Sequence, residues 1–162
     1  MAARLIRGLL PRRLLSRVWR PALLAVSVWV SVMGAPALAA EQALHRRVAD
    51  QTLAWGPCPA FMPKGCELAV LHGNPAEPNS DIFFRIPAKA EIPKHWHSSA
   101  ERMILVEGVL QVTYTGQAPV TLRPGSYAYG PPKAPHSAVC RSATPCVLFI
   151  AFEGPIDAHQ NH

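Results

Sequence analysis

From residue 58 onward, hydrophobic and polar positions alternate in short runs that proline and glycine separate. The runs are rich in Val, Ile, Leu, Phe and Tyr, which suit a pleated, half-buried surface. No amphipathic helix of ten residues interrupts them. The pattern predicts strands at Glu67–His72, Ile82–Ile86, Glu91–His97, Arg102–Glu107, Val109–Thr115, Val120–Leu122, Ser126–Tyr129, Ser137–Cys140 and Val147–Phe152.

Many short strands at this spacing predict an all-β double-sheet jelly roll over residues 61–155. Within it, we expect Glu91–His97 and Arg102–Glu107 to be antiparallel neighbours in one sheet. Residues 41–60 are mixed in character and predict an N-terminal arm, either irregular or with a short helix around Gln42 to Thr52. Residues 156–162 are expected to form a polar tail.

Residues 1–40 have the pattern of an export signal. Six arginines precede an apolar stretch at Ala22–Gly34, and Ala37-Leu38-Ala39 provides a small-x-small cleavage site. The alternative is an uncleaved membrane anchor of about the minimum spanning length. Arg12-Arg13-Leu14-Leu15 is similar to a twin-arginine signal, although Pro11 precedes the pair. The leader predicts a periplasmic or secreted protein with no membrane contact after cleavage.

The formal net charge of +6 belongs to this leader. Six of the sixteen Lys and Arg residues lie in residues 1–40, and the remaining ten balance the ten acidic residues. About 120 residues follow the leader, enough for one domain with a single core. Because no basic tract lies in this part, we expect no nucleic-acid partner.

The four cysteines, Cys58, Cys66, Cys140 and Cys146, all follow the leader. In an exported protein an even count predicts disulfides and no free thiol. Sequence alone leaves three pairings open, of which Cys58 with Cys66 and Cys140 with Cys146 would each close a short loop. Metal ligation is the alternative for Cys140, because a strand that begins at His136 places both side chains on one face.

The candidate chemistry lies in the run His95-Trp96-His97-Ser98-Ser99-Ala100-Glu101. Alternate strand residues share a face, so His95 and His97 point the same way. Glu101 can return to that interior after a short polar turn, and His136 can complete the set from a distant strand. Three imidazoles and a carboxylate suit one divalent transition metal, and Fe, Mn, Ni, Cu and Zn all accept such ligands.

This spacing resembles the first motif of the cupin family, G-x5-H-x-H-x3,4-E-x6-G. His95, His97, Glu101 and Gly108 are in register, and Lys89 stands where the family has its leading glycine.

The second cupin motif, G-x5-P-x-G-x2-H-x3-N, is similar to the segment that begins at Gly125. Pro131 and His136 match it, whereas Lys133 and Cys140 replace a glycine and an asparagine. The resemblance covers roughly residues 60–155 and implies a jelly-roll barrel with a metal site at His95, His97, Glu101 and His136.

Two functions are compatible with this resemblance. The first is a metal-dependent enzyme, a dioxygenase or isomerase, that acts on a small molecule, with Glu101 as both ligand and catalytic proton acceptor. The second is a non-catalytic module that binds or senses a metal or small ligand. Tyr127 and Tyr129 alternate beside the second motif, and one of them could line the pocket, although β-propensity alone explains both.

A homodimer is the expected assembly, because a jelly roll has sheet edges to protect and C2 pairs are common. The arm also carries apolar residues that need cover, from either their own barrel or a neighbouring subunit: Leu44, Leu53, Trp55, Phe61 and Met62.

Overall fold

The computed structural model describes residues 41–161, so the leader predicted at residues 1–40 lies outside the described residues. Every described strand belongs to the compact unit that begins at Ala43. The strands are β1 (Trp55–Pro57), β2 (Glu67–His72), β3 (Ser80–Ile86), β4 (Glu91–Trp96), β5 (Glu101–Glu107), β6 (Leu110–Tyr114), β7 (Val120–Leu122), β8 (Tyr127–Gly130), β9 (His136–Cys140), β10 (Cys146–Phe152) and β11 (His159–Gln160).

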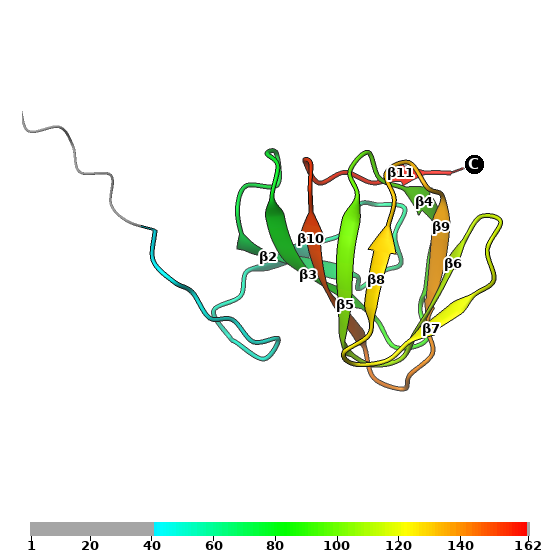
Figure 1. Cartoon of the computed structure of the whole chain (residues 1–162). Coiled ribbons are helices and arrows are strands. Elements are labelled where there is room, and N and C mark those ends of the chain that lie inside the picture. Colours follow the sequence, from blue (N-terminus) through cyan, green and yellow to red (C-terminus); the bar gives the residue numbers. More distant parts are fainter. Residues whose placement is uncertain (1–40, 162) are drawn as a thin grey trace, which may run out of the picture. The chain divides into compact units, whose positions relative to one another are not determined.

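These strands form two antiparallel sheets that face each other around a shared interior (Figure 1). The six-stranded sheet has the order β1-β2-β3-β10-β5-β8, and the five-stranded sheet has the order β11-β4-β9-β6-β7. The predicted all-β jelly roll is confirmed. The sequence pattern did not predict the short strands β1 and β11.

The prediction that the strands at residues 91–97 and 102–107 are neighbours in one sheet is wrong. Strand β4 lies in the five-stranded sheet and β5 in the six-stranded sheet, so Ser98-Ser99-Ala100 carries the chain from one sheet to the other. Ser99 fixes this crossing, because its buried hydroxyl accepts a hydrogen bond from the Gly154 N–H, at 2.7 Å. Residues on either side of the crossing therefore face each other across the interior.

A β-bulge in β4 aims His95 at the interior. Between the pairs Ile92–Ala138 and His95–His136, β4 advances three residues while β9 advances two. Without the extra residue, Ile92 and His95 would point to opposite faces, because strand side chains alternate. Both are buried here. Pro93 lies in the bulge, where the missing proline N–H does not interrupt the ladder.

The core lies between the sheets. It consists of inward-facing residues from both, with fully buried members on β3, β4, β5 and β6, for example Ile86, Ile92, Leu105 and Leu110. The burial of β5 and β9 alternates residue by residue, as expected of strands with one face on a core. The same alternation places Glu101 and His136 on the inner face.

The arm at residues 41–54 is irregular, with turns but no helix, so the irregular form of the prediction holds rather than the helical one. Of the apolar residues named for the predicted arm, Met62 lies against the core, and the Arg85 guanidinium stacks on the Trp55 ring at 3.5 Å. Leu44 is exposed. The homodimer stays a prediction. Among residues 41–161 no helix has the length and apolar character needed to span a membrane.

The cysteines form the two local pairs, Cys58–Cys66 and Cys140–Cys146, and no free thiol is left. The alternative of Cys140 as a metal ligand is therefore wrong, because its sulfur is bonded to Cys146. By closing short loops, each bridge is expected to stabilise the fold by about 2–3 kcal/mol. The disulfides fit an oxidising compartment.

Both lysines that replace motif glycines keep the left-handed backbone that glycine favours. Lys89 has φ 62° and Lys133 has φ 60°, close to the values at Gly108 and Gly125, 85° and 88°. The turn geometry is thus retained without the glycine, at some cost in strain. At Lys133 the main-chain N–H donates to the His97 carbonyl at 2.7 Å, which ties this turn to the histidine run.

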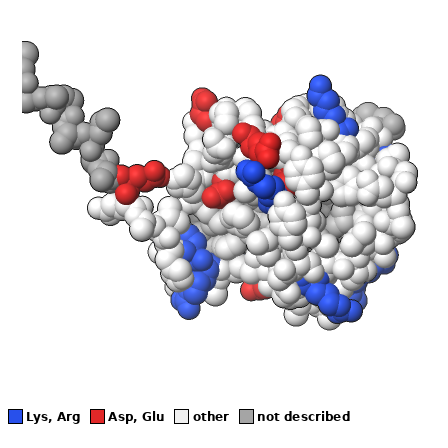
Figure 2. Space-filling model, in the orientation of Figure 1, with Lys and Arg blue, Asp and Glu red and all other residues white. Residues whose placement is uncertain are grey.

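Figure 2 shows Lys and Arg side chains at several separate places on one face of the molecule, so they do not form a single basic patch there.

Candidate metal centre

Three buried histidines from the five-stranded sheet converge in the interior. His95 and His136 are cross-strand partners on β4 and β9, and His97 directly follows β4. One nitrogen of each ring lies within 4.8 Å of the corresponding nitrogen of the other two. The spacing of a metal-binding group is therefore formed by strand register and one bulge.

Each imidazole is oriented by a main-chain carbonyl. The Nδ1 atom of His95 lies 2.8 Å from the Pro93 oxygen, that of His136 lies 3.0 Å from the Ala134 oxygen, and that of His97 contacts the Asp157 oxygen. A carbonyl only accepts, so each Nδ1 carries the hydrogen, and each Nε2 keeps a lone pair. This outer-shell arrangement is characteristic of metal-binding histidines.

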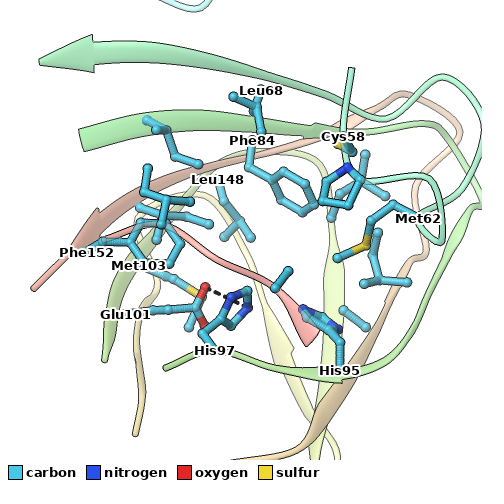
Figure 3. Close-up of a pocket in the computed structure, with 18 of the residues that line it drawn as sticks. Cys58, Met62, Leu68, Phe84, His95, His97, Glu101, Met103, Leu148 and Phe152 are labelled. Atoms are coloured by element: carbon cyan, nitrogen blue, oxygen red, sulfur yellow. Dashed lines mark ion pairs between the residues drawn. The ribbon is translucent and has the colours of Figure 1, made fainter. Parts of the chain in front are cut away.

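Glu101 reaches the same point from the six-stranded sheet. Its Oε1 atom lies 3.3 Å from Nε2 of His97, and its Oε2 atom lies 3.8 Å from Nε2 of His136. Figure 3 shows the Glu101 carboxyl beside the His97 ring, with His95 nearby along the same edge of the cavity. The sequence predicts these four residues as one set, and the structure brings them together.

Burial shifts the pKa of each of these groups in the direction that favours its uncharged form. Desolvation, together with His136, lowers the pKa of His95 to about 3, and desolvation lowers that of His136 to about 4. Burial also lowers the pKa of His97. In contrast, burial raises the pKa of Glu101 to about 8. At neutral pH the cluster thus contains three neutral imidazoles and one protonated carboxyl group.

Tyr114 is a residue that the sequence analysis missed. It pairs with His136 across β6 and β9, and the two rings are 4.8 Å apart. Its hydroxyl is buried and has no hydrogen-bond partner. Burial and the nearby Glu101 carboxyl raise the Tyr114 pKa. The tyrosines that the sequence analysis considered, Tyr127 and Tyr129, are exposed on β8.

Gly130, opposite Glu101 on β8, leaves the space that Tyr114 and Glu101 share. A Cβ atom at this position would lie 2.5 Å from the Tyr114 hydroxyl and 3.0 Å from Oε2 of Glu101. Any larger residue would have to displace one of them. The phenol and the carboxyl group are therefore near neighbours, although no hydrogen bond joins them.

The cluster forms one side of a cavity of about 420 Å³. Figure 3 shows Leu68, Phe84 and Leu148 on the opposite side from His95 and His97. Residues between β1 and β2 and the end of β1 contribute Pro57, Cys58, Pro59 and Met62 to the wall. The C-terminal segment contributes Ile156, Asp157 and Ala158.

Asp157 is the second residue that the sequence analysis missed. Its carbonyl oxygen contacts Nδ1 of His97, and its carboxylate accepts from the Ser98 N–H at 2.8 Å and pairs with His159 at 3.0 Å. The predicted polar tail thus includes a segment that holds a metal-ligand candidate. Every residue type has a main-chain carbonyl, so the sequence gives no signal for this contact to His97.

Residues 82–152 match the family model described as Cupin domain. This range contains all four candidate ligands and β3 to β10 almost entirely. No curated protein sequence matches the chain.

Solved structures share the fold. The polyketide cyclase RemF from Streptomyces resistomycificus superposes with a TM-score of 0.60 and 17% identity over 74% of this chain and 87% of its own. An RmlC-like cupin from Shewanella frigidimarina superposes with a TM-score of 0.54 and 23% identity over 71% of this chain and 94% of its own. The DMSP lyase DddQ from Ruegeria pomeroyi superposes with a TM-score of 0.58 and 18% identity over 67% of this chain, which covers only 61% of that protein. At identities below 25%, these superpositions show a common fold.

Proposed function

Because the chain belongs to the cupin superfamily, we propose that it binds one divalent transition metal and acts on a small molecule in the cavity beside it. The ligands would be Nε2 of His95, His97 and His136 and a carboxylate oxygen of Glu101. The observation that carries this proposal is the set of three Nδ1 contacts to carbonyl oxygens. They leave an Nε2 lone pair free on each of three rings whose candidate ligand atoms lie within 4.8 Å of one another.

The donor set fits such a metal. Imidazole nitrogen and carboxylate oxygen are accepted by Fe, Mn, Ni, Cu and Zn in their divalent states. Neutral imidazoles need lose no proton before they coordinate, since burial lowers the pKa values of His95 and His136 to about 3 and 4. Glu101 must lose one, so metal binding at neutral pH would release about one proton.

An enzyme of the dioxygenase or isomerase type is the more specific form of this proposal. A bound metal would supply Lewis-acid or redox chemistry. The chain would supply orientation through the carbonyl-anchored histidines and exclude water by means of the apolar walls. Glu101 would alternate between metal ligand and proton acceptor at its carboxyl group.

A non-catalytic module for binding or sensing is the second candidate function. One observation favours it: among the described residues that line the cavity, the only acidic side chain besides Glu101 is Asp157. The Asp157 carboxylate is engaged by Ser98 and His159, so it is not a free acid or base. Oxygen uptake or substrate turnover by metal-loaded protein separates the two functions.

Export to the periplasm or medium is also part of the proposal. The basic and apolar leader at residues 1–40 and the two disulfides support it. N-terminal sequencing of protein recovered from the exported fraction checks it, with cleavage after Ala39 or nearby as the expected result.

Metal analysis tests the proposed site. We expect about one metal ion per wild-type chain and loss of most of it in His97→Ala. His45→Ala is the matched control, since His45 is exposed on the arm and should leave the metal content unchanged. Full metal occupancy in His97→Ala would overturn the assignment.

A further inference from the structure

The cavity has a polar end and an apolar remainder. His95, His97, His136 and Glu101 form the polar end. The walls that lead away from it are aliphatic, aromatic or thioether side chains, including Met62, Leu68, Phe84, Met103, Leu148 and Ile150. No lysine, arginine, serine, threonine, asparagine or glutamine from residues 41–161 lines it.

The strand alternation explains why no cation reaches the cavity. On β3, Phe84 faces inward, and Arg85 therefore faces outward, where it stacks on Trp55 and pairs with Glu67 at 2.9 Å. On β5, Arg102 lies between the inward-facing Glu101 and Met103, and it pairs with Glu153 on the outside. These arginines cannot turn inward without reversal of the strand register.

Asp157, the only other acidic residue in the wall among residues 41–161, has its three oxygen atoms engaged within the protein. Its carbonyl oxygen contacts His97, and its two carboxylate oxygens are held by Ser98 and His159. A charged group of a ligand that lies against the apolar walls would therefore lose water without gaining an oppositely charged side chain from the described residues. Burial of an unpaired charge is strongly unfavourable.

We infer that the cavity takes an uncharged, largely apolar small molecule with one polar end, and that this polar end lies at the histidine–glutamate cluster. The inference rests on the proposed function in that the metal would bind the polar end. A volume of about 420 Å³ lies at the small end of the range for ligand pockets. Molecules with a second charged group, such as dicarboxylates and phosphorylated compounds, are excluded by the apolar far wall.

The test uses probes that share a metal-binding end and differ only at the far end. Zinc-loaded protein is titrated calorimetrically with 4-isopropylbenzohydroxamate and with 4-carboxybenzohydroxamate, whose para groups are similar in size. We expect the isopropyl compound to bind at least tenfold more tightly. Equal or tighter binding of the carboxy compound, or no binding of either to fully loaded protein, would overturn the inference.

Leu68 tests the position of the far end, because it is only partly buried on β2 and tolerates a longer side chain. In Leu68→Arg the preference for the isopropyl probe should shrink at least tenfold, since the guanidinium can pair with the para carboxylate. Leu68→Met is the matched control and should keep the wild-type preference. An unchanged preference in a folded Leu68→Arg variant would contradict the assigned orientation.

A metal-free pair keeps this inference separate from the proposed function. p-Cymene and terephthalate need no metal, and terephthalate carries a charge at both ends, so either orientation places one charge against the apolar wall. With metal removed by a chelator, p-cymene should raise the melting temperature and terephthalate should not, as apolar cavities bind apolar ligands. If p-cymene binds and the protein never takes up metal, only the proposed function fails. If metal binds and p-cymene causes no shift, the inference on ligand class fails.

Discussion

The two sheets contribute different chemistry to the same cavity. The five-stranded sheet and the residue after β4 provide His95, His97 and His136, and β6 provides Tyr114. The six-stranded sheet provides Glu101 and much of the apolar wall, from Leu68 on β2 to Ile150 on β10. Nitrogen donors thus lie on one sheet, and the carboxyl group faces them from the other.

The difference lies in how each donor is held. Main-chain carbonyls fix all three imidazoles, and a main-chain acceptor is present whether or not metal is bound. The carboxyl group of Glu101 contacts side chains instead, with Oε1 at 3.3 Å from Nε2 of His97 and Oε2 at 3.8 Å from Nε2 of His136. In the proposed site the histidines would therefore form a preorganised half-site, and Glu101 would be the adjustable ligand whose protonation follows metal binding.

The largest expected effect is the loss of metal affinity when one candidate ligand is removed from each sheet in turn. His136→Ala should weaken zinc binding by more than the roughly 10–100-fold that is typical of outer-shell changes. Glu101→Gln should weaken it less, because three imidazoles remain in place. Competition with a chelator of known affinity measures both, with His45→Ala as the unaffected control. A larger loss in Glu101→Gln than in His136→Ala would contradict the division of roles.

The stability of metal-free protein should depend on pH in opposite directions for the two sheets. Because the pKa of His95 falls from 6.5 to about 3 on folding and that of His136 to about 4, the unfolded chain binds extra protons below pH 6.5. Stability is therefore lost as pH falls below 6.5. Because the pKa of Glu101 rises from 4.5 to about 8, the folded chain holds the extra proton there. Above pH 6.5 its contribution dominates, and stability falls by up to about 1.4 kcal/mol per pH unit.

Thermal melts from pH 5 to pH 8 with chelator present measure this profile. Wild type should be most stable near pH 6.5. Glu101→Gln should lose the decline above pH 6.5 and fall more steeply below it, because Glu101 no longer holds a folded-state proton that offsets those taken up by the unfolded histidines. A Glu101→Gln variant that declines as steeply as wild type between pH 6.5 and 8 would show that another group is responsible.

Tyr114 sharpens the comparison, because it lies on the histidine sheet beside the carboxyl group of the other sheet. Its buried hydroxyl has no hydrogen-bond partner, and the Glu101 carboxyl group, which shares the space beside Gly130 with it, could accept its hydrogen once ionised. Tyr114→Phe should lower metal affinity roughly tenfold, the scale of a lost outer-shell partner. The same change should leave the metal-free protein as stable or more stable, since it removes an unsatisfied hydroxyl. Parallel losses in both forms would indicate a packing role instead.

The sequence predicts the strands and the four candidate ligands because both follow local rules. Alternation and turn residues mark the strands, and the spacing of His95, His97 and Glu101 matches a known motif. It does not predict which sheet each strand joins, since Ser98-Ser99-Ala100 has the same turn-like composition whether it closes a hairpin or crosses between sheets. The sequence also does not predict the bulge at Pro93, which is seen only in the pairing of β4 with β9.

The remaining parts of the site depend on tertiary contacts. Tyr114 has the inward parity of Leu110 and Val112, but parity alone does not place its hydroxyl next to Glu101. Asp157 acts through a carbonyl oxygen that every residue type possesses. The sequence also does not say whether Trp55 and Met62 pack on their own domain or on another subunit; the structure places Met62 against the core and Trp55 under the Arg85 guanidinium.

The smallest expected effect concerns the turn that leads to His136. Lys133 adopts φ 60°, where a Cβ atom is strained. Lys133→Gly should raise the free energy of unfolding by about 0.5–1 kcal/mol at most, less the entropy that glycine adds to the unfolded chain. Metal affinity should not change, because the His136 contact to Ala134 is kept. Urea unfolding measures the change, and a clear destabilisation would mean that the lysine side chain holds the turn.

X-ray absorption spectroscopy of the metal that is bound to the purified protein tests the central claim most directly. Three imidazole nitrogens and one carboxylate oxygen should appear, at about 2.0–2.2 Å if the metal is zinc, and His136→Ala should remove one imidazole or all of the metal. A shell with fewer than three imidazoles in wild-type protein, or one that is unchanged in His136→Ala, would contradict the account.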